Sequence, residues 1–271
     1  MRKVSALLVV FLFFTSIIIP ISHAQGTNKK STEVGTVRVP SSVLNISKEN
    51  TYPNSSQDMP YLQPSDLAKE LLGTSKVKIE NPNLIRMLNE SAVSKNPLAI
   101  GFRATIYLGE WPLNYESMET NVNWEYKKVN MNFFDNRGGK LPYRVRYTQD
   151  AQKQVKGGLT ARIPDSDDVQ KMMILKAAEK TKLPLAFSTI VGVGTKKENG
   201  YNVPAKKVGY LNSYTPAVSE RGKVTYGEVF LLLHGSKRTI AVKNVTSQGI
   251  GAWIPVQDHL SLSFSVHNQP R

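Results

Sequence analysis

The clearest chemical feature of the sequence is a concentration of cationic side chains between residues 127 and 162. Nine lysines and arginines fall in this 36-residue stretch, against two aspartates. Arg144 and Arg146 are two positions apart in a segment that alternates apolar and polar residues, so in a strand both side chains share one face. Guanidinium groups in a row suit hydrogen-bonded pairing with phosphate or carboxylate.

This basic segment predicts a surface that binds an anionic polymer or a membrane surface. We expect Arg144 and Arg146 on an exposed strand face, with Arg137 and Lys140 near one end of that strand. The alternative is a solvated strand face whose charges discourage pairing at the sheet edge. No nucleic-acid partner is expected.

A second candidate site is the stretch from Asn244 to His259, which combines turn-forming residues and two glycines with an Asp-His pair. A ligand loop there would use Trp253 as a stacking platform, with Asp258 and His259 as polar contacts. Adjacent strand residues point to opposite faces, so the Asp-His pair could act together only within a turn. Structure explains the stretch at least as well, with glycines in sharp turns, Trp253 in the core and Asp258 in a turn.

Motifs of several enzyme classes are missing from the sequence. It has no nucleophile elbow, no His-Glu-x-x-His pair and no phosphate-binding P-loop. The alternative of a hydrolase or transferase acting on cell-wall polymer therefore needs acids that folding brings together. The acids considered for that role are Glu110, Glu125, Glu228 and Asp258.

The sequence predicts neither a metal site nor a cofactor site. Beyond the N-terminal segment the histidines are His234, His259 and His267, and none lies within five residues of another. A zinc site would have to be assembled by the fold. Three aspartates between residues 165 and 168 lack the glycine and closing glutamate of a calcium loop, so they indicate a helix start. With no cysteine in the chain, thiolate metal sites, thiol nucleophiles and disulfides are excluded.

Signals at the starts of three segments predict three helices. Ser65 can cap a short helix that stops at Gly73, and Asn81 can cap a second with Pro82 at its first position. A longer helix is expected at residues 165–181, where the aspartates favour the positive end of the helix dipole.

Most of the remaining chain alternates with a period of two, which is typical of strands. A slip at Lys127-Lys128 fits a β-bulge. The composition of residues 135–139 indicates a turn, so residues 129–148 are interpreted as a hairpin, and Gly235-Ser236-Lys237 as the turn of another. The expected strands lie at about residues 98–108, 122–126, 129–133, 141–147, 154–163, 185–193, 207–214, 224–234, 238–244, 250–256 and 260–267.

About ten strands, one longer helix and two short N-terminal helices predict an α+β fold of mostly antiparallel β-sheet, or a β-sandwich with helical additions. We divide the chain into a signal peptide at residues 1–24, an extended or partly disordered lead-in at 25–63 and a β-rich domain at 64–271. In an alternative organisation, two β lobes divide near the helix at 165–181.

The N-terminus predicts export out of the cytoplasm. Arg2 and Lys3 precede a 16-residue apolar run, Pro20 breaks it, and small residues precede a cut after Ala24. The run is short for a bilayer, which needs about 20 helical residues, although an uncleaved N-terminal anchor is the alternative. Cleavage removes two of the +14 formal charges and leaves +12. Such a cationic protein is attracted to anionic polymers and lipid head groups.

Five segments resemble the YfkD-like family, exported proteins of spore-forming Gram-positive bacteria. They are NISKENTYPN (45–54), KVKIENPNLIRMLNE (76–90), IGFRATIYLGEWPL (100–113), KVTYGEVF (223–230) and VKNVTSQGIGAWIPVQDH (242–259). The resemblance implies export and this class of host, and it transfers no catalytic or binding residue. The missing motifs and sparse histidines favour a non-catalytic envelope protein, which the basic segment would hold near anionic wall polymers or lipids.

Overall fold

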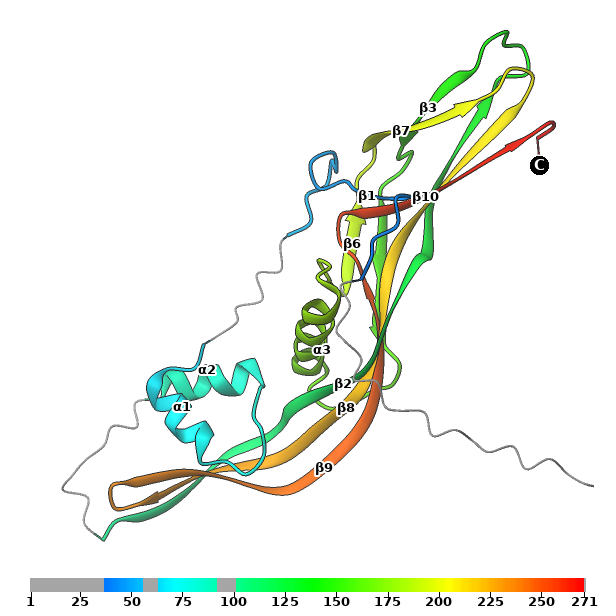
Figure 1. Cartoon of the computed structure of the whole chain (residues 1–271). Coiled ribbons are helices and arrows are strands. Elements are labelled where there is room, and N and C mark those ends of the chain that lie inside the picture. The colour runs from blue at the N-terminus through cyan, green and yellow to red at the C-terminus, as the bar shows by residue number, and fades with distance from the viewer. Residues whose placement is uncertain (1–36, 56–62, 92–100, 271) are drawn as a thin grey trace, which may run out of the picture. The chain divides into compact units, whose positions relative to one another are not determined.

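The structure is a computed structural model that describes residues 37–55, 63–91 and 101–270. All of these residues belong to one compact unit, residues 36–271. In chain order its elements are β1 (Val43–Asn45), α1 (Asp66–Gly73), α2 (Pro82–Glu90), β2 (Arg103–Asp135), β3 (Tyr143–Thr148), β4 (Lys153–Lys156), β5 (Gly158–Leu159), α3 (Ser166–Thr181), β6 (Ser188–Val191), β7 (Lys196–Val203), β8 (Val208–His234), β9 (Lys237–Pro255) and β10 (His259–His267) (Figure 1).

The main sheet is built around β8, and every strand pair in it is antiparallel. β2 lies along the whole of β8 on one side. On the other side, β10 pairs with residues 208–214 of β8 and β9 pairs with residues 217–234. β1 and β5 extend the sheet beyond β10 and β9, while β3–β7 and β4–β6 form two separate two-stranded sheets. The predicted α+β class with mostly antiparallel sheet is confirmed.

Three of these strands are much longer than predicted. At positions that resemble strand ends, a bulge interrupts the pairing and the strand continues beyond it. β2 merges three expected strands, and five register shifts interrupt its pairing with β8. One shift falls between Asn123 and Lys127 and the next between Lys128 and Asn130, which confirms the predicted bulge near Lys127. β8 and β9 each merge two expected strands, and a tight turn at Gly235, with a φ of 58°, joins them as predicted.

The hairpin predicted at residues 129–148 is wrong, because β3 pairs with β7 instead of with the end of β2. Side chains replace the missing ladder: the amides of Asn130 and Asn132 both donate to the carbonyl oxygen of Thr148, at 2.6 and 2.8 Å. Strand periodicity identifies a strand and not its partner, and the polar β7 segment gives no apolar alternation to identify it.

The three helices begin close to where the sequence predicts, two of them at their predicted capping residues. The Ser65 hydroxyl accepts from the backbone of Ala68, and the Asn81 side chain accepts from two backbone N–H groups, with Pro82 as the first helical residue. α3 follows Asp165, which has a left-handed backbone with a φ of 46° and makes no side-chain capping hydrogen bond. None of these helices, which are those of the described part of the chain, has the length and apolarity to cross a membrane.

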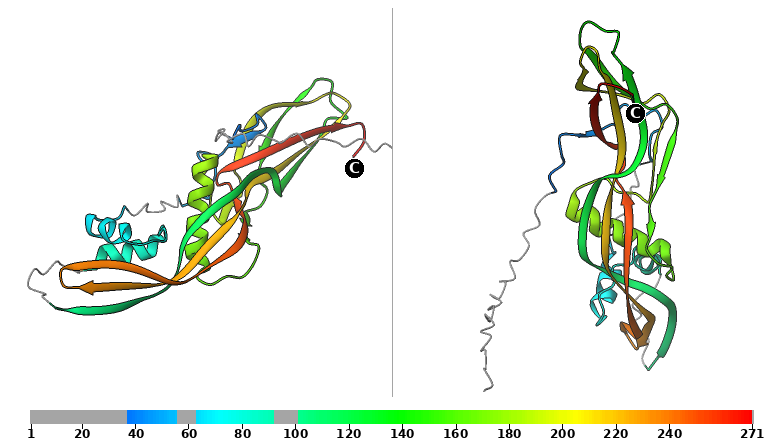
Figure 2. Two further views of the ribbon diagram at one scale, coloured as in Figure 1. Left: turned by 60° about the horizontal axis from the view of Figure 1, so that its bottom comes forward. Right: turned by 90° about the vertical axis from the view of Figure 1, so that its right-hand side faces the viewer.

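All three helices cover one face of the β2–β8–β9 sheet (Figures 1 and 2). α3 buries Val169, Met172 and Met173 against sheet residues that include Val218 and Val224. The first two helices pack on the same face farther along the sheet, over a core whose sheet members are Leu113, Val229, Leu231 and Ile240. A third core joins β10 to the small sheets.

Candidate functional site

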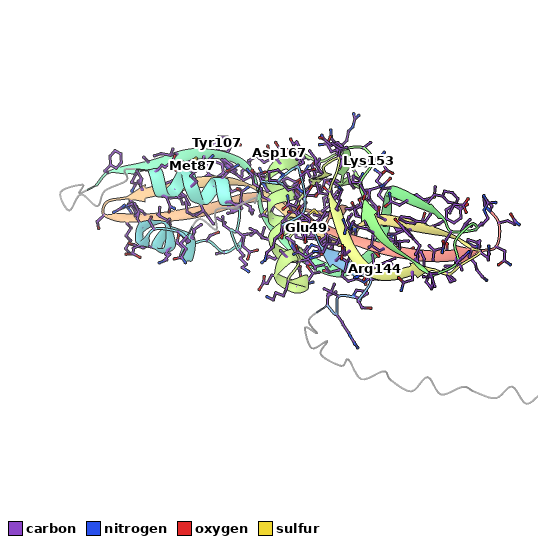
Figure 3. All side chains as sticks on the ribbon, turned by 90° about the horizontal axis from the view of Figure 1, so that it is seen from above. Glu49, Met87, Tyr107, Arg144, Lys153 and Asp167 are labelled. Atoms are coloured by element: carbon purple, nitrogen blue, oxygen red, sulfur yellow. The ribbon has the colours of Figure 1, made fainter. Side chains whose placement is uncertain are left out.

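The predicted basic segment forms an exposed surface on the β3–β7 sheet. Val145 and Tyr147 are buried, and the side chains of Arg144 and Arg146 are 69% and 55% exposed. β7 adds Lys196 and Glu198 to the same face. We call the surface made by these four charged residues, Arg144, Arg146, Lys196 and Glu198, the basic face. Figure 3 shows Arg144 far from Met87 of α2.

An acidic residue that the sequence reasoning missed lies within the basic face. The Glu198 carboxylate contacts the guanidinium groups of both Arg146 and Arg144, the second at 3.6 Å. This carboxylate neutralises part of the positive charge that the arginines contribute. Because the β7 strand was not predicted, its cross-strand register with β3 was not available to identify this pairing.

The other two predicted residues of the basic segment lie in the turn after β2. Arg137 forms a salt bridge with Asp135 at 2.6 Å. Its hydrogen bonds hold the pKa of the Asp135 carboxyl at about 2, so this pair carries no net charge at neutral pH. Lys140 is exposed.

This part of the molecule nevertheless keeps a net positive charge after these ion pairs are counted. The segments that form the two small sheets, residues 136–162 and 188–207, contain 11 basic residues and 2 acidic ones. Nine of the 11 basic residues are exposed. A depression of about 410 Å³ between Glu49, Arg146, Lys196, Lys197 and Glu198 borders the basic face. Several cations therefore remain after the local pairs form, and their net charge favours long-range attraction of anions.

The stretch from Asn244 to His259 is mostly strand and not a loop. Trp253 lies in β9, is half-buried and stacks on Tyr126 with ring centroids 5.0 Å apart. Asp258 lies in the turn before β10, with a left-handed φ of 50°. Cavities of about 690, 490 and 410 Å³ in the described part of the chain are not lined by Trp253, Asp258 or His259, so these cavities give the ligand-loop prediction no support.

Asp258 has a structural task that the sequence does not reveal. Its carboxylate accepts hydrogen bonds from the side-chain amides of Asn50 and Asn54, at 2.9 and 2.8 Å. Both amides also donate to the carbonyl oxygen of Ile190. His259 does not contribute to this group, since its Nδ1 atom lies 2.7 Å from the carbonyl oxygen of Gln257. The turn therefore ties the segment after β1 to β6.

The acids considered for a hydrolase do not gather around a described cavity. Glu110 lies opposite Glu228 in the β2–β8 ladder, and Glu228 accepts a hydrogen bond of 2.8 Å from Asn244. Glu125 is exposed elsewhere on β2. Within residues 37–55, 63–91 and 101–270, no group of three or more acidic or histidine side chains is placed to hold a metal ion.

Folding instead assembles a buried polar cluster around Glu220 of β8, which has no exposed surface. Its carboxylate accepts from the hydroxyl groups of Tyr115 at 3.0 Å, Thr120 at 2.6 Å and Ser117. Lys180 of α3 donates to the Ser117 hydroxyl at 2.7 Å. Burial, followed by the charge of Glu220, raises the pKa of Tyr115, so this phenol stays protonated and donates. The predicted strands stop on either side of Glu220, which is why sequence reasoning missed it.

The largest described cavity, of about 690 Å³, lies between the three helices. Its lining residues are Pro64, Leu72, Ile79, Glu80, Pro82, Ile85, Met172, Leu175, Lys176, Ala178 and Glu179. A smaller cavity of about 490 Å³ lies at the start of α3 and has an acidic lining. The spacing of the apolar residues in the predicted helices indicated buried faces. It did not indicate that the apolar faces of neighbouring helices would be separated by a cavity.

Comparison with known proteins gives one family. The model of the YfkD-like protein family matches residues 40–271. The uncharacterized protein YfkD of Bacillus subtilis (strain 168) is 59% identical over 264 residues, which cover 97% of each chain. No solved structure matches the chain.

Proposed function

Since the chain belongs to the YfkD-like family, we propose that it is an exported protein of the cell envelope that binds an anionic polymer without catalysis. The observation that carries this proposal is the set of nine exposed basic residues on the segments of the small sheets. The signal-like N-terminus supports the extracytoplasmic location, and the formal charge of +14 supports the class of partner.

The expected partner is a polymer with repeated phosphate or carboxylate groups, such as a teichoic acid. The spacing of Arg144 and Arg146 along one strand presents guanidinium groups to successive anionic units. Their shared contact with Glu198 leaves the face partly neutralised, so a polymer has to compete with this carboxylate for both arginines. Binding should therefore be moderate and salt-dependent.

The proposal is tested by co-sedimentation of the full mature chain with purified wall teichoic acid at low and high salt. Binding should fall steeply as salt rises, because exposed charges are screened beyond about 8 Å at physiological ionic strength. The double variant Arg144→Gln/Arg146→Gln should bind more weakly, and Glu198→Gln should bind more tightly because it removes the competing carboxylate.

A matched control removes two cations from β8 instead of β3. Arg221→Gln/Lys223→Gln changes the net charge equally, and both side chains are exposed. This control should retain most of the binding. Equal loss in the two double variants would show that net charge acts without a dedicated face, and binding that is indifferent to salt would contradict the proposal altogether.

A further inference from the structure

We propose that the cavity between α1, α2 and α3 binds the single aliphatic chain of an amphiphile whose head group is uncharged, such as a monoacylglycerol. This site is separate from the basic face and does not depend on polymer binding. It rests on the walls of the cavity, on the contacts that hold it open and on the charges at its rim.

The walls of the cavity are apolar. Eight of its 11 lining residues are aliphatic side chains, prolines, an alanine or a methionine, contributed by all three helices and by the segments that precede α1 and α2. Its volume of about 690 Å³ lies within the range of about 300–1,000 Å³ that is usual for small-molecule sites. None of the described lining residues is aromatic. Flexible aliphatic walls, including Met172, suit an adaptable chain better than a flat ring that needs stacking.

Polar contacts keep the helices apart around this space. At one point, the Asn81 amide before α2 donates to Asp168 of α3 at 2.9 Å. At another, Lys176 of α3 donates to Glu80 at 2.9 Å. Collapse of the apolar faces onto each other would remove them from water, which is favourable, but it would strain these contacts. The helices are therefore held by their packing on the sheet and by these polar contacts between them, and their apolar faces are left apart at the cavity.

The charged groups at the rim of the cavity are two carboxylates and two lysines, of which Lys78 lies outside the lining and balances the charge through Glu80. The Glu80 carboxylate receives both Lys78, at 2.6 Å, and Lys176. Burial alone would raise the pKa of Glu80, but the hydrogen bonds from the two lysines outweigh it and hold the pKa below the usual value. Glu179 adds a second carboxylate to the lining.

This balance selects the head group. An anionic head could pair with Lys176 only in competition with Glu80, and it would lie beside two carboxylates. A cationic head would compete with Lys78 and Lys176 for Glu80. A head with hydroxyl and ester groups can accept from the remaining N–H groups of Lys176 and donate to a carboxylate, without displacing an existing ion pair. A monoacylglycerol combines such a head with one aliphatic chain.

The test is equilibrium dialysis of the full mature chain against radiolabelled 1-monopalmitoylglycerol, kept below its aggregation concentration. We expect saturable binding of one molecule per chain. Palmitate has the same chain with an anionic head and should bind about tenfold more weakly, and free glycerol should not bind. Palmitate that binds as tightly would overturn the head-group assignment, and absence of saturable binding would overturn the site.

Variants place the binding in the cavity. Leu175 is half-buried and lies outside the core clusters, so Leu175→Trp should fill the cavity and lower affinity at least about tenfold without lowering the melting temperature. Met118→Trp, on exposed β2, is the control for an added indole and should bind normally. Ala178→Leu is a smaller filler that serves if the tryptophan variant does not fold. Unchanged affinity in a folded filling variant would overturn the proposal.

Discussion

Glu220 shows how one buried charge can connect three elements. Its carboxylate accepts from three hydroxyl groups of β2, and one of these, on Ser117, accepts in turn from Lys180 of α3. A buried carboxylate without partners costs several kcal/mol, so each hydroxyl donor offsets part of that cost. The hydrogen bonds run from the Lys180 ammonium through the Ser117 hydroxyl to the Glu220 carboxylate, so the donor and the acceptor of each bond are defined.

Replacement of Glu220 should therefore destabilise the fold according to how many donors lose their acceptor. Glu220→Leu leaves the hydroxyl groups of Tyr115, Ser117 and Thr120 without their carboxylate acceptor. We expect a loss of about 3 kcal/mol in the free energy of unfolding. Glu220→Gln keeps one acceptor oxygen and should lose about half as much. Urea unfolding measures both. The exposed Glu119→Gln, with its 3.8 Å contact to Arg221, should change stability by less than about 0.5 kcal/mol. A Glu220→Leu protein as stable as the wild type would contradict this account.

At the scale of elements, local signals predicted the helices well. Ser65 and Asn81 each act on backbone groups within three residues, so their capping role can be read from the sequence alone. The lengths of the strands could not be predicted from such local signals. Pro216, Gly222 and Gly227 lie inside β8, where glycine and proline normally indicate an end.

The candidate basic face was predictable only in part, for a related reason. Alternation identifies which residues of β3 are exposed, and both arginines are. Their contact with Glu198 depends on pairing between segments about 50 residues apart, which periodicity does not determine. The cavity between the helices was beyond prediction, because it depends on polar contacts such as the one between Asn81 and Asp168.

The edge of β9 illustrates how the long sheet is kept from pairing with other chains. The Thr160 backbone and hydroxyl pair with Gly251 at one point, and the Thr74 hydroxyl accepts from the Ile240 N–H at another. Residues 243–249 between these points are exposed, and within the described structure no strand pairs with their outer edge. Their polar composition and a bulge near Asn244 discourage added strands.

We predict that apolar residues at this edge cause association. Ser247→Val/Gln248→Val raises the β-propensity of the open segment and should produce soluble oligomers or aggregates as concentration rises, seen by light scattering. Ser219→Val/Thr225→Val adds the same side chains to β8, whose backbone is already paired on both sides, and should leave the protein monodisperse to the same extent as the wild type. Identical behaviour of the two variants would exclude the open edge as the cause.

At the scale of the whole molecule, the two proposed sites can be separated experimentally. The basic face lies on β3 and β7, and the cavity lies among the helices, with Arg144 far from α2 in Figure 3. Charge variants on the first should leave uptake of the amphiphile unchanged, and filling variants in the second should leave polymer binding unchanged. The proposed ligands of both sites belong to the envelope, and the proposed location there rests on the predicted signal in the N-terminal segment.

Export is therefore the prediction on which the cellular role depends. Protein recovered from outside the cytoplasm should begin at Gln25, because the apolar run, Pro20 and the small residues before the cut match a cleavable signal. Ala24→Tyr places a large residue at the cut and should leave an uncleaved chain in the membrane fraction. N-terminal sequencing of both forms is the measurement. The wild-type protein should also leave the cell surface in high salt without detergent, since charge alone would retain it. A wild-type chain that begins at Met1 and needs detergent for its release would instead establish the uncleaved anchor.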